Sequence, residues 1–437
     1  MPSAADEASL SGAASAGLGA AAASTAGARP ARTPGLGFIF VTLLLLVLGF
    51  GTIIPVLPGL VTQFAGGSVA AGSHAYGWLI GVFALMQFFA SPVLGALSDR
   101  YGRRRVLLIA LAGSTIDNVV MGLAPSLGWL FAGRIIAGLT AGVLATANAY
   151  IADVTPPERR AQGFGLVGAA FGIGFVIGPA LGGVLGHIHL RLPFFFSAGC
   201  LVLNWLYGAF VLPESLPPGR RRAFSWRRAN PVGALVLLRR LPGILELGGM
   251  YFLYMLGSLM LQSVWVLYTG YRYGWNTLQV GLSLTFVGIS MAVVQGRLVH
   301  AIIGWLGEQR GLAIGLVLTA LVMIGYGSAT EGWMIYVLIA FAALGGIAGP
   351  AAQAIITRRV PADEQGAVQG ALASLGSLAG VAGPPLAAWS FGLCIAPQAP
   401  IHLPGVAFFE AAGLVLLALV LALRALQAEA VRAGAAV

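Results

Sequence analysis

The sequence predicts an all-α integral membrane protein with twelve transmembrane helices arranged in two pseudo-symmetric six-helix bundles. Of its 437 residues, 58% are hydrophobic and only 9% are charged, which is too few charges to cover a soluble domain of this length. Twelve apolar runs are each long enough to cross a bilayer, which takes about 20 residues. Two landmarks also repeat at one spacing, since Gly102 matches Gly307 and Gly178 matches Gly383, both 205 residues later. The common spacing predicts a duplicated bundle.

Six of the apolar runs precede a long polar interval and six follow it. The runs lie at 38–60, 76–97, 105–125, 127–152, 163–186, 193–213, 245–269, 278–303, 311–328, 332–357, 367–391 and 404–425. The predicted organisation is a disordered tail 1–36, a first bundle 37–213, a basic linker 214–243, a second bundle 244–426 and a tail 427–437. The linker is expected to lie near anionic lipid headgroups, with a site for a regulatory partner as the alternative. The first tail lacks an apolar core, so it is not typical of a signal peptide.

The arginines are distributed unequally between the two sides of the membrane. With both termini on one side, that side carries 21 arginines and the other carries two, Arg191 and Arg272. The positive-inside rule therefore places both termini in the cytoplasm of a cell whose inner or plasma membrane holds the protein. The formal net charge of +10 reflects these short loops, so a nucleic-acid partner is not expected.

Several kinds of chemistry are not expected. The two cysteines, Cys200 and Cys394, lie in apolar segments, which predicts neither a disulfide nor a metal site. His187 and His189 lie in a loop without further metal ligands nearby, so they are interpreted as solvent-facing residues that bind no metal. No nucleophile and base stand together in the sequence. We therefore expect no enzyme activity and no cofactor.

Several motifs are concentrated in the first half. The loop GALSDRYGRRRVLLI, 95–109, places five charges between two apolar runs, and GRIIAGLTAG carries Arg134 within a span. Three further segments are PVLPGL at 55–60, NAYIAD at 148–153 and FGIGFVIGPALGG at 171–183. Together these motifs resemble the major facilitator superfamily, and within it the drug:proton antiporter branch that contains the tetracycline exporters. The resemblance covers roughly residues 40 to 425 and implies a transporter that works by alternating access.

The charged loop resembles the family's signature between helices 2 and 3. The matching residues are Gly95, Asp99, Arg100, Gly102, Arg103 and Arg104. Gly102 suits a tight reversal, and the resemblance implies that Asp99 faces the N-terminus of helix 11. Arg103 is expected to pair with Asp153, which would make the loop a latch that holds the cytoplasmic side closed. Arg105 is interpreted as a lipid anchor. In the second half His300 and Gly304 replace the first glycine and the acid, so a single strong latch is expected.

Two ionisable residues are predicted at membrane depth. Asp117 and Arg134 lie about eight positions from the turn that joins their helices, so each would be about 12 Å deep. A charge at the centre of a transmembrane helix costs about 2.5–3.5 kcal/mol, which makes both residues functional candidates. We interpret them as groups that couple transport to protons. The alternative is an ion pair with a structural role.

A glycine motif in the fifth span resembles one that the family associates with antiporters. Its members are Gly174, Gly178, Pro179, Gly182 and Gly183. Pro179 removes a backbone donor and is expected to break the helix, while the glycines allow close packing. The resemblance implies a seal against leak, and a simple packing kink is the alternative.

Polar and aromatic residues in the central spans are candidates for lining a substrate cavity. They are Gln87, Thr140, Asn148, Tyr251, Tyr254, Gln262, Trp265, Gln295, Gln353 and Gln369. As a set they suit a small amphiphilic molecule. The tetracycline exporters carry an acid, a histidine and an acid where this chain has Leu46, Met291 and Thr319. We therefore predict a different substrate on the same scaffold.

The function predicted from the sequence is proton-coupled efflux of a small amphiphilic compound by a functional monomer, with the proton gradient as energy source. One alternative is an importer or facilitator of a small polar metabolite. The other is a sensor on the same fold that transports nothing.

Overall fold

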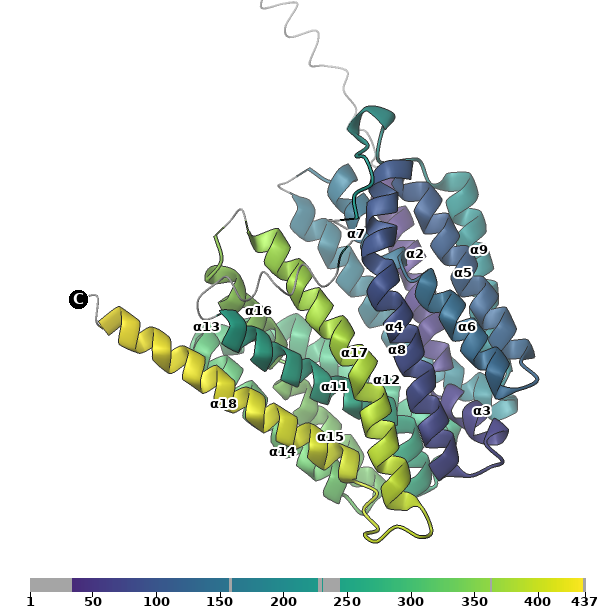
Figure 1. The fold of residues 1–437 in the computed structure, drawn as a ribbon, viewed down its shortest axis with the longest axis vertical. Helices are drawn as coiled ribbons and strands as arrows, with labels where there is room; N and C mark the ends of the chain where they lie inside the picture. The colour runs from purple at the N-terminus through teal and green to yellow at the C-terminus, as the bar shows by residue number, and fades with distance from the viewer. Residues whose placement is uncertain (1–33, 157–158, 227–229, 231–243, 362–363, 435–437) are drawn as a thin grey trace, which may run out of the picture.

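The computed structural model describes residues 34–156, 159–226, 230, 244–361 and 364–434, and within these residues every long element is a helix (Figure 1). The first bundle contains α2 Pro34–Ile53, α3 Leu57–Phe64, α4 Val69–Tyr101, α5 Arg103–Leu123, α6 Leu127–Leu139, α7 Val143–Val154, α8 Arg160–Ile188 and α9 Leu192–Val211. The second contains α11 Ile244–Tyr273, α12 Thr277–Val293, η3 Val294–Leu298, α13 Val299–Leu306, α14 Glu308–Ser328, α15 Gly332–Gly345, α16 Ala348–Arg358, α17 Gln365–Ile395 and α18 Val406–Gly434.

The helices account for the predicted number of spans. Eleven segments of the described chain are long and apolar enough to cross a membrane, and the bent pair α2–α3 supplies a twelfth when it is taken as one span. This pair bends by 42° because Pro55, between the two helices, provides no N–H and disfavours helical geometry in the residue before it. The sequence predicted one uninterrupted run here.

The internal repeat is confirmed at backbone level. Gly102 ends α4 and precedes α5 with φ +102°, and Gly307 ends α13 and precedes α14 with φ +76°. Only glycine adopts such angles readily, so the same tight reversal recurs 205 residues later. The two halves therefore share a turn as well as a pattern of spans.

Each half also contains one broken span that the sequence analysis treated as continuous. The fourth span is divided between α6 and α7 around Ala141, and the tenth between α15 and α16 around Gly346. The breaks lie 205 residues apart, so they belong to the repeat. In the eighth span, one turn of π-helix at Val294–Leu298 interrupts the α-helical geometry. Such interruptions frequently mark functional positions in helices.

The two bundles meet through α4 against α17 and through α8 against α12. A Cβ on Gly81 of α4 would lie 2.7 Å from the Pro385 ring of α17, and one on Gly183 of α8 would lie 3.2 Å from Gly281 Cα of α12. Small residues thus allow the helices to approach closely in lipid. These contacts lie where α4 begins and α8 ends.

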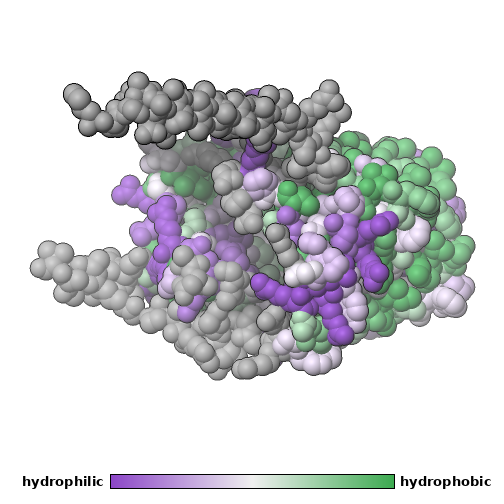
Figure 2. Space-filling view, turned by 90° about the horizontal axis from the view of Figure 1, so that it is seen from above, coloured by the Kyte–Doolittle hydropathy of each residue, from purple (hydrophilic) through white to green (hydrophobic). Residues whose placement is uncertain are grey.

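The opposite end of the molecule, where α4 ends and the linker leaves α9, is called the linker end below. There the two bundles diverge, as the separation of α4 from the start of α17 shows (Figure 1). Figure 2 views the molecule from the linker end. Hydrophilic residues gather over the ends of the helices there, whereas the flank of the first bundle is hydrophobic.

Three predicted features differ in the structure or lie outside it. Pro179 does not break its helix, since α8 runs through it from Arg160 to Ile188. The predicted C-terminal tail continues α18 as far as Gly434. Residues 1–33 of the first tail and 231–243 of the linker lie outside the described residues, and α2 already begins at Pro34.

Candidate functional site

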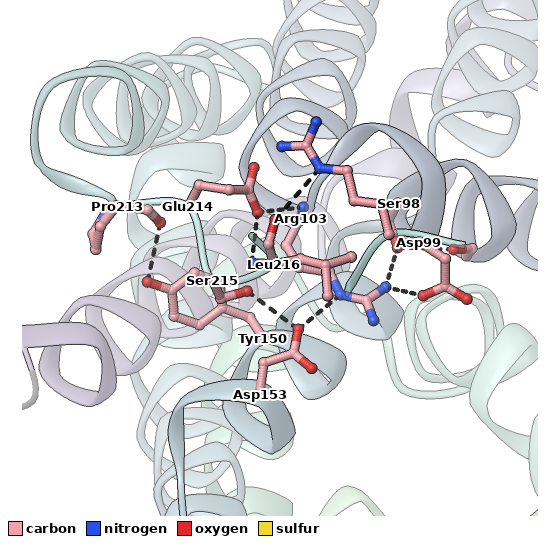
Figure 3. A network of polar contacts seen from close by, with 11 residues as sticks. Ser98, Asp99, Arg103, Tyr150, Asp153, Pro213, Glu214, Ser215 and Leu216 are labelled. Atoms are coloured by element: carbon pink, nitrogen blue, oxygen red, sulfur yellow. Dashed lines mark hydrogen bonds and ion pairs between the residues drawn. The ribbon is translucent and has the colours of Figure 1, made fainter. Parts of the chain in front are cut away.

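The charged loop at the linker end is organised around Arg103 (Figure 3). Its guanidinium Nη1 lies 2.5 Å from Asp99 Oδ1 and donates to Ser98 Oγ at 2.6 Å, and its Nε donates to Asp153 Oδ2 at 3.0 Å. Asp99 comes from the end of α4 and Asp153 from the end of α7, so one side chain joins three helices. The predicted Arg103–Asp153 ion pair is present.

Glu214, which the sequence analysis did not select, holds the start of α5. Its Oε1 accepts from the backbone N–H groups of Arg103 at 2.8 Å and Leu216 at 3.1 Å. A carboxylate here satisfies a free donor at a helix N-terminus and interacts favourably with the helix dipole. A Cβ on Gly102 would collide with this carboxylate. Glycine is therefore favoured at this position both by its positive φ and by the lack of space for a side chain. An acid directly after the sixth span was the available signal.

The start of the linker is bound to the same cluster. Tyr150 donates from its hydroxyl to the Pro213 carbonyl at 3.2 Å, and Ser215 Oγ donates to Asp153 Oδ2 at 3.2 Å. Farther along, the Arg222 N–H donates to the Asp99 carbonyl at 3.1 Å. Residues 213–222 therefore lie across the ends of α4, α5 and α7.

The remaining residues of the loop occupy separate places. Arg104 donates to the Ala209 carbonyl of α9, and the Arg100 guanidinium lies 5.0 Å from the centroid of the Tyr101 ring. Gly95 lines a pocket of about 230 Å³ with Asp99 on one side and linker residue Ser225 on another. The glycine thus borders open space on α4.

In this conformation Asp99 has its contacts within the first bundle and the linker. The charged contacts given above come from Arg103, whereas the close approaches of α4 to α17 occur at the other end, around Gly77 and Gly81. The Arg103–Asp153 pair was expected only when the linker end is closed, but it is present while the bundles diverge there. The contact of Asp99 with the N-terminus of α17 was likewise expected only for a closed linker end. It stays a prediction for that state.

The second half contains an ion pair that mirrors the first with the charges exchanged. Arg358 Nη2 pairs with Glu308 Oε1, and these residues lie 205 positions after Asp153 and Arg103. The sequence analysis treated the second copy of the loop as degenerate because its glycine and acid are missing. That expectation concerned the glycine and the acid, and the Glu308–Arg358 pair is a further link between the two helix ends that it did not include.

Asp117 and Arg134 form a buried ion pair between α5 and α6. Arg134 Nε donates to Asp117 Oδ1 at 3.2 Å, and its Nη2 pairs with Oδ2. Their side chains are 2% and 7% exposed, and among the described residues they are the buried charged side chains. The Phe83 ring of α4 lies 5.5 Å from the guanidinium carbon. The pair predicted from equal depth is therefore present, inside the first bundle.

The glycine motif packs against two neighbouring helices. Added Cβ atoms on Gly174, Gly178 and Gly182 would meet α2 at Val47, Gly51 and Thr52. Those three glycines lie four residues apart, so they form one face of α8. Gly183 faces α12 of the other bundle instead. This face accounts for the continuous helix α8 despite Pro179, because close packing on both sides supports the helix.

The predicted cavity residues differ in their exposure. Gln262, Gln295, Gln353 and Gln369 are exposed, whereas Gln87, Thr140, Asn148 and Tyr254 are half-buried. Gln369 donates to Thr357 Oγ1 at 3.0 Å, and Thr140 donates to carbonyls of its own helix. Tyr251 and Trp265 are buried, with Trp265 Nε1 donating to Ser283 at 3.1 Å.

Both broken spans have a carbonyl bound by a side chain of a neighbouring helix. Ser91 Oγ of α4 donates to the Ala141 carbonyl at 3.2 Å, and Gln295 Nε2 of η3 donates to the Gly346 carbonyl at 3.2 Å. Broken helices at matching positions of two repeats are the usual pointer to a transporter's binding site. Met291 and Thr319, two positions at which the chain departs from the tetracycline exporters, lie beside the second break.

Comparison with known proteins agrees with this architecture. The profile of the Major Facilitator Superfamily matches residues 39–384, which is well over half of the chain. The chain belongs to the Major Facilitator Superfamily. As a member of this superfamily, it is a multi-pass membrane transporter of small molecules and not an enzyme.

This member of the superfamily is also similar to individual known proteins. It is 42% identical over 343 residues to the tetracycline resistance protein, class C, of Escherichia coli, a match that covers 78% of this chain and 86% of that one. It is 37% identical over 342 residues to the class G protein of Vibrio anguillarum, covering 77% and 85%. The crystal structure of the human organic anion transporter MFSD10 superposes with a TM-score of 0.68 at 26% identity, over 90% of this chain and 100% of that chain.

Proposed function

We propose that this major facilitator exports a small amphiphilic compound in exchange for protons, as a monomer with both termini in the cytoplasm. The observation that carries the proposal is the 42% identity to a tetracycline resistance protein over 86% of that relative's length. This similarity favours export over import of a polar metabolite and over a sensor without transport.

The arrangement of the bundles supports alternating access. Close glycine packing joins them at one end, and they diverge at the linker end, so tilting one against the other would exchange which end is open. On closure the end of α4 would approach the start of α17, which brings Asp99 toward a helix N-terminus that favours an anion. Asp99, held in place by Arg103, would then act as a latch for the closed state.

Asp117 is the group that we assign to proton coupling. A proton bound there would remove the charge that holds Arg134, and the freed guanidinium would need a new partner in a buried site. Proton binding thereby changes the relative free energies of conformations that place Arg134 differently. The exchange of a buried pair for a protonated acid is the physical link between the proton gradient and movement of the bundles.

The substrate is proposed to differ from a cation-bound tetracycline. Leu46, Met291 and Thr319 carry neither a carboxylate nor an imidazole. They therefore cannot bind a metal ion through such a group, and they cannot carry a titratable proton. Met291 and Thr319 lie beside the second broken span, where Gln295 contributes an amide. An apolar site with amide groups favours a molecule that combines a hydrophobic body with a few hydrogen-bonding groups.

Everted membrane vesicles that contain the full chain test this proposal. Compounds are first selected by comparing growth inhibition of a deletion strain with that of a complemented strain. An acid-interior gradient should then collapse when a selected compound is added, and vesicles without the protein are the control. Uptake by whole cells alone would indicate import and contradict the proposal. A lack of any pH or flux response across the compound panel would favour the sensor.

A further inference from the structure

A second pocket lies at the start of α14, away from the Arg103 cluster. It has a volume of about 440 Å³ and is lined by three arginines, Arg310, Arg358 and Arg359, together with the acid Glu308. One of the positive charges, on Arg358, is paired with Glu308. Three arginines around one acid are an unusual concentration of charge in a chain that is 9% charged.

The internal repeat indicates what kind of group this pocket accommodates. At the start of α5, the equivalent place is filled by the Glu214 carboxylate of the linker, which accepts from the Arg103 N–H at 2.8 Å. The start of α14 lies 205 residues later, and there the pocket takes the place of that linker segment. An oxyanion suits both sites, because each combines a helix N-terminus with arginine side chains.

The position of the pocket relative to the lipid-facing surface points to a phospholipid. Arg310 lies on the same face of α14 as the exposed apolar residues Ile314, Val317, Leu321 and Ile324, which follow it at alternating spacings of four and three. This stripe is the surface that α14 presents to lipid tails. Trp305, which is 85% exposed, precedes the pocket by one residue and is typical of the interfacial aromatic belt.

We propose that the pocket formed by Arg310, Arg358 and Arg359 binds the phosphate of an anionic phospholipid, whose tails lie along the exposed stripe of α14. The charged head would occupy the site that a carboxylate of the chain fills in the first half. This is a lipid site separate from the substrate path, and it does not depend on which compound is transported.

Melting of the purified full chain in detergent tests the proposal. Short-chain phosphatidylglycerol should raise the melting temperature in a saturable way that yields an apparent dissociation constant. Phosphatidylcholine with the same tails should not. Arg310→Gln should weaken phosphatidylglycerol binding about fivefold, since an arginine near an anionic headgroup contributes about 1 kcal/mol.

Arg105→Gln is the matched control. Arg105 is exposed, lies 205 residues before Arg310 and precedes a similar exposed stripe on α5, but the start of its helix is occupied by Glu214. As a lipid anchor beside a helix start that Glu214 already fills, Arg105 offers only a general attraction to headgroups and no saturable pocket, so its substitution should change the dissociation constant less than twofold. Equal effects of the two substitutions, or equal binding of phosphatidylcholine, would overturn the proposal. Inorganic phosphate that produces the same shift would show that the site takes a soluble anion, and the lipid assignment would then be wrong.

Discussion

The strongest test of the proposed coupling concerns Asp117→Asn. The substitution keeps the shape of the side chain but removes the charge that faces Arg134, in a site where the two side chains are 2% and 7% exposed. An arginine left without its counter-charge in a buried site costs about 3–5 kcal/mol. Without a titratable carboxyl, substrate movement should also lose its dependence on pH.

Two measurements distinguish a coupling group from a structural pair. Stability is measured as the free energy of unfolding of the purified protein, and coupling as proton release evoked by substrate in everted vesicles. A second variant that combines Asp117→Asn with Arg134→Gln removes both charges and should recover most of the lost stability. If Asp117 carries the coupling proton, this double variant should still show no proton movement with substrate.

An acid whose partner is an exposed arginine provides the control for stability. Glu308→Gln removes a carboxylate whose partner Arg358 has a side chain that is 74% exposed, so it should cost no more than about 1 kcal/mol. Two results would refute the reasoning. One is an Asp117→Asn protein as stable as the wild type, and the other is a folded variant with an unchanged ratio of protons to substrate.

The loop turns and the first ion pair give two further predictions. Gly102→Ala should lower the free energy of unfolding by about 1–2 kcal/mol more than Gly307→Ala does. Both substitutions strain a positive φ, but only the first also displaces the Glu214 carboxylate from the start of α5. Equal shifts in thermal unfolding would argue against a capping role for Glu214. Exchanging the charges by Arg103→Glu with Asp153→Arg copies the order found in the second half, so the double variant should exceed the sum of its single variants in stability by about 0.5–1 kcal/mol. It should still transport more slowly than wild type, since the latch acid at the end of α4 loses its arginine; wild-type turnover would contradict the latch.

Some elements were predictable because their signals are local. Hydropathy located the spans, since about 20 apolar residues in a row have one stable placement in a bilayer. The Asp117–Arg134 pair was predicted because the two charges lie equally deep in adjacent spans. The Arg103–Asp153 pair was predicted because both residues lie at the cytoplasmic ends of their spans, where the resemblance also implies a pair.

Other features could not be predicted because they depend on segments distant in sequence. Glu214 reaches Arg103 only because the linker folds back over the ends of α4 and α5, and the acid after the sixth span does not by itself indicate that partner. The pair of Glu308 with Arg358 was missed because the two halves were compared for identical residues. The repeat instead has an ion pair at the same two positions with the charges exchanged. Pro179 was expected to break α8, but packing of the glycine face supports the helix on both sides.

The sequence by itself determined that the chain spans a membrane many times as two related bundles, because burial of apolar side chains in lipid and the duplication of glycines are properties of the chain alone. Only the tertiary structure decided which charges meet, where the two spans break and which end of the molecule is held together. These depend on the packing of helices against one another, and in a bilayer that packing is determined by the shape of contacting surfaces, which hydropathy does not encode.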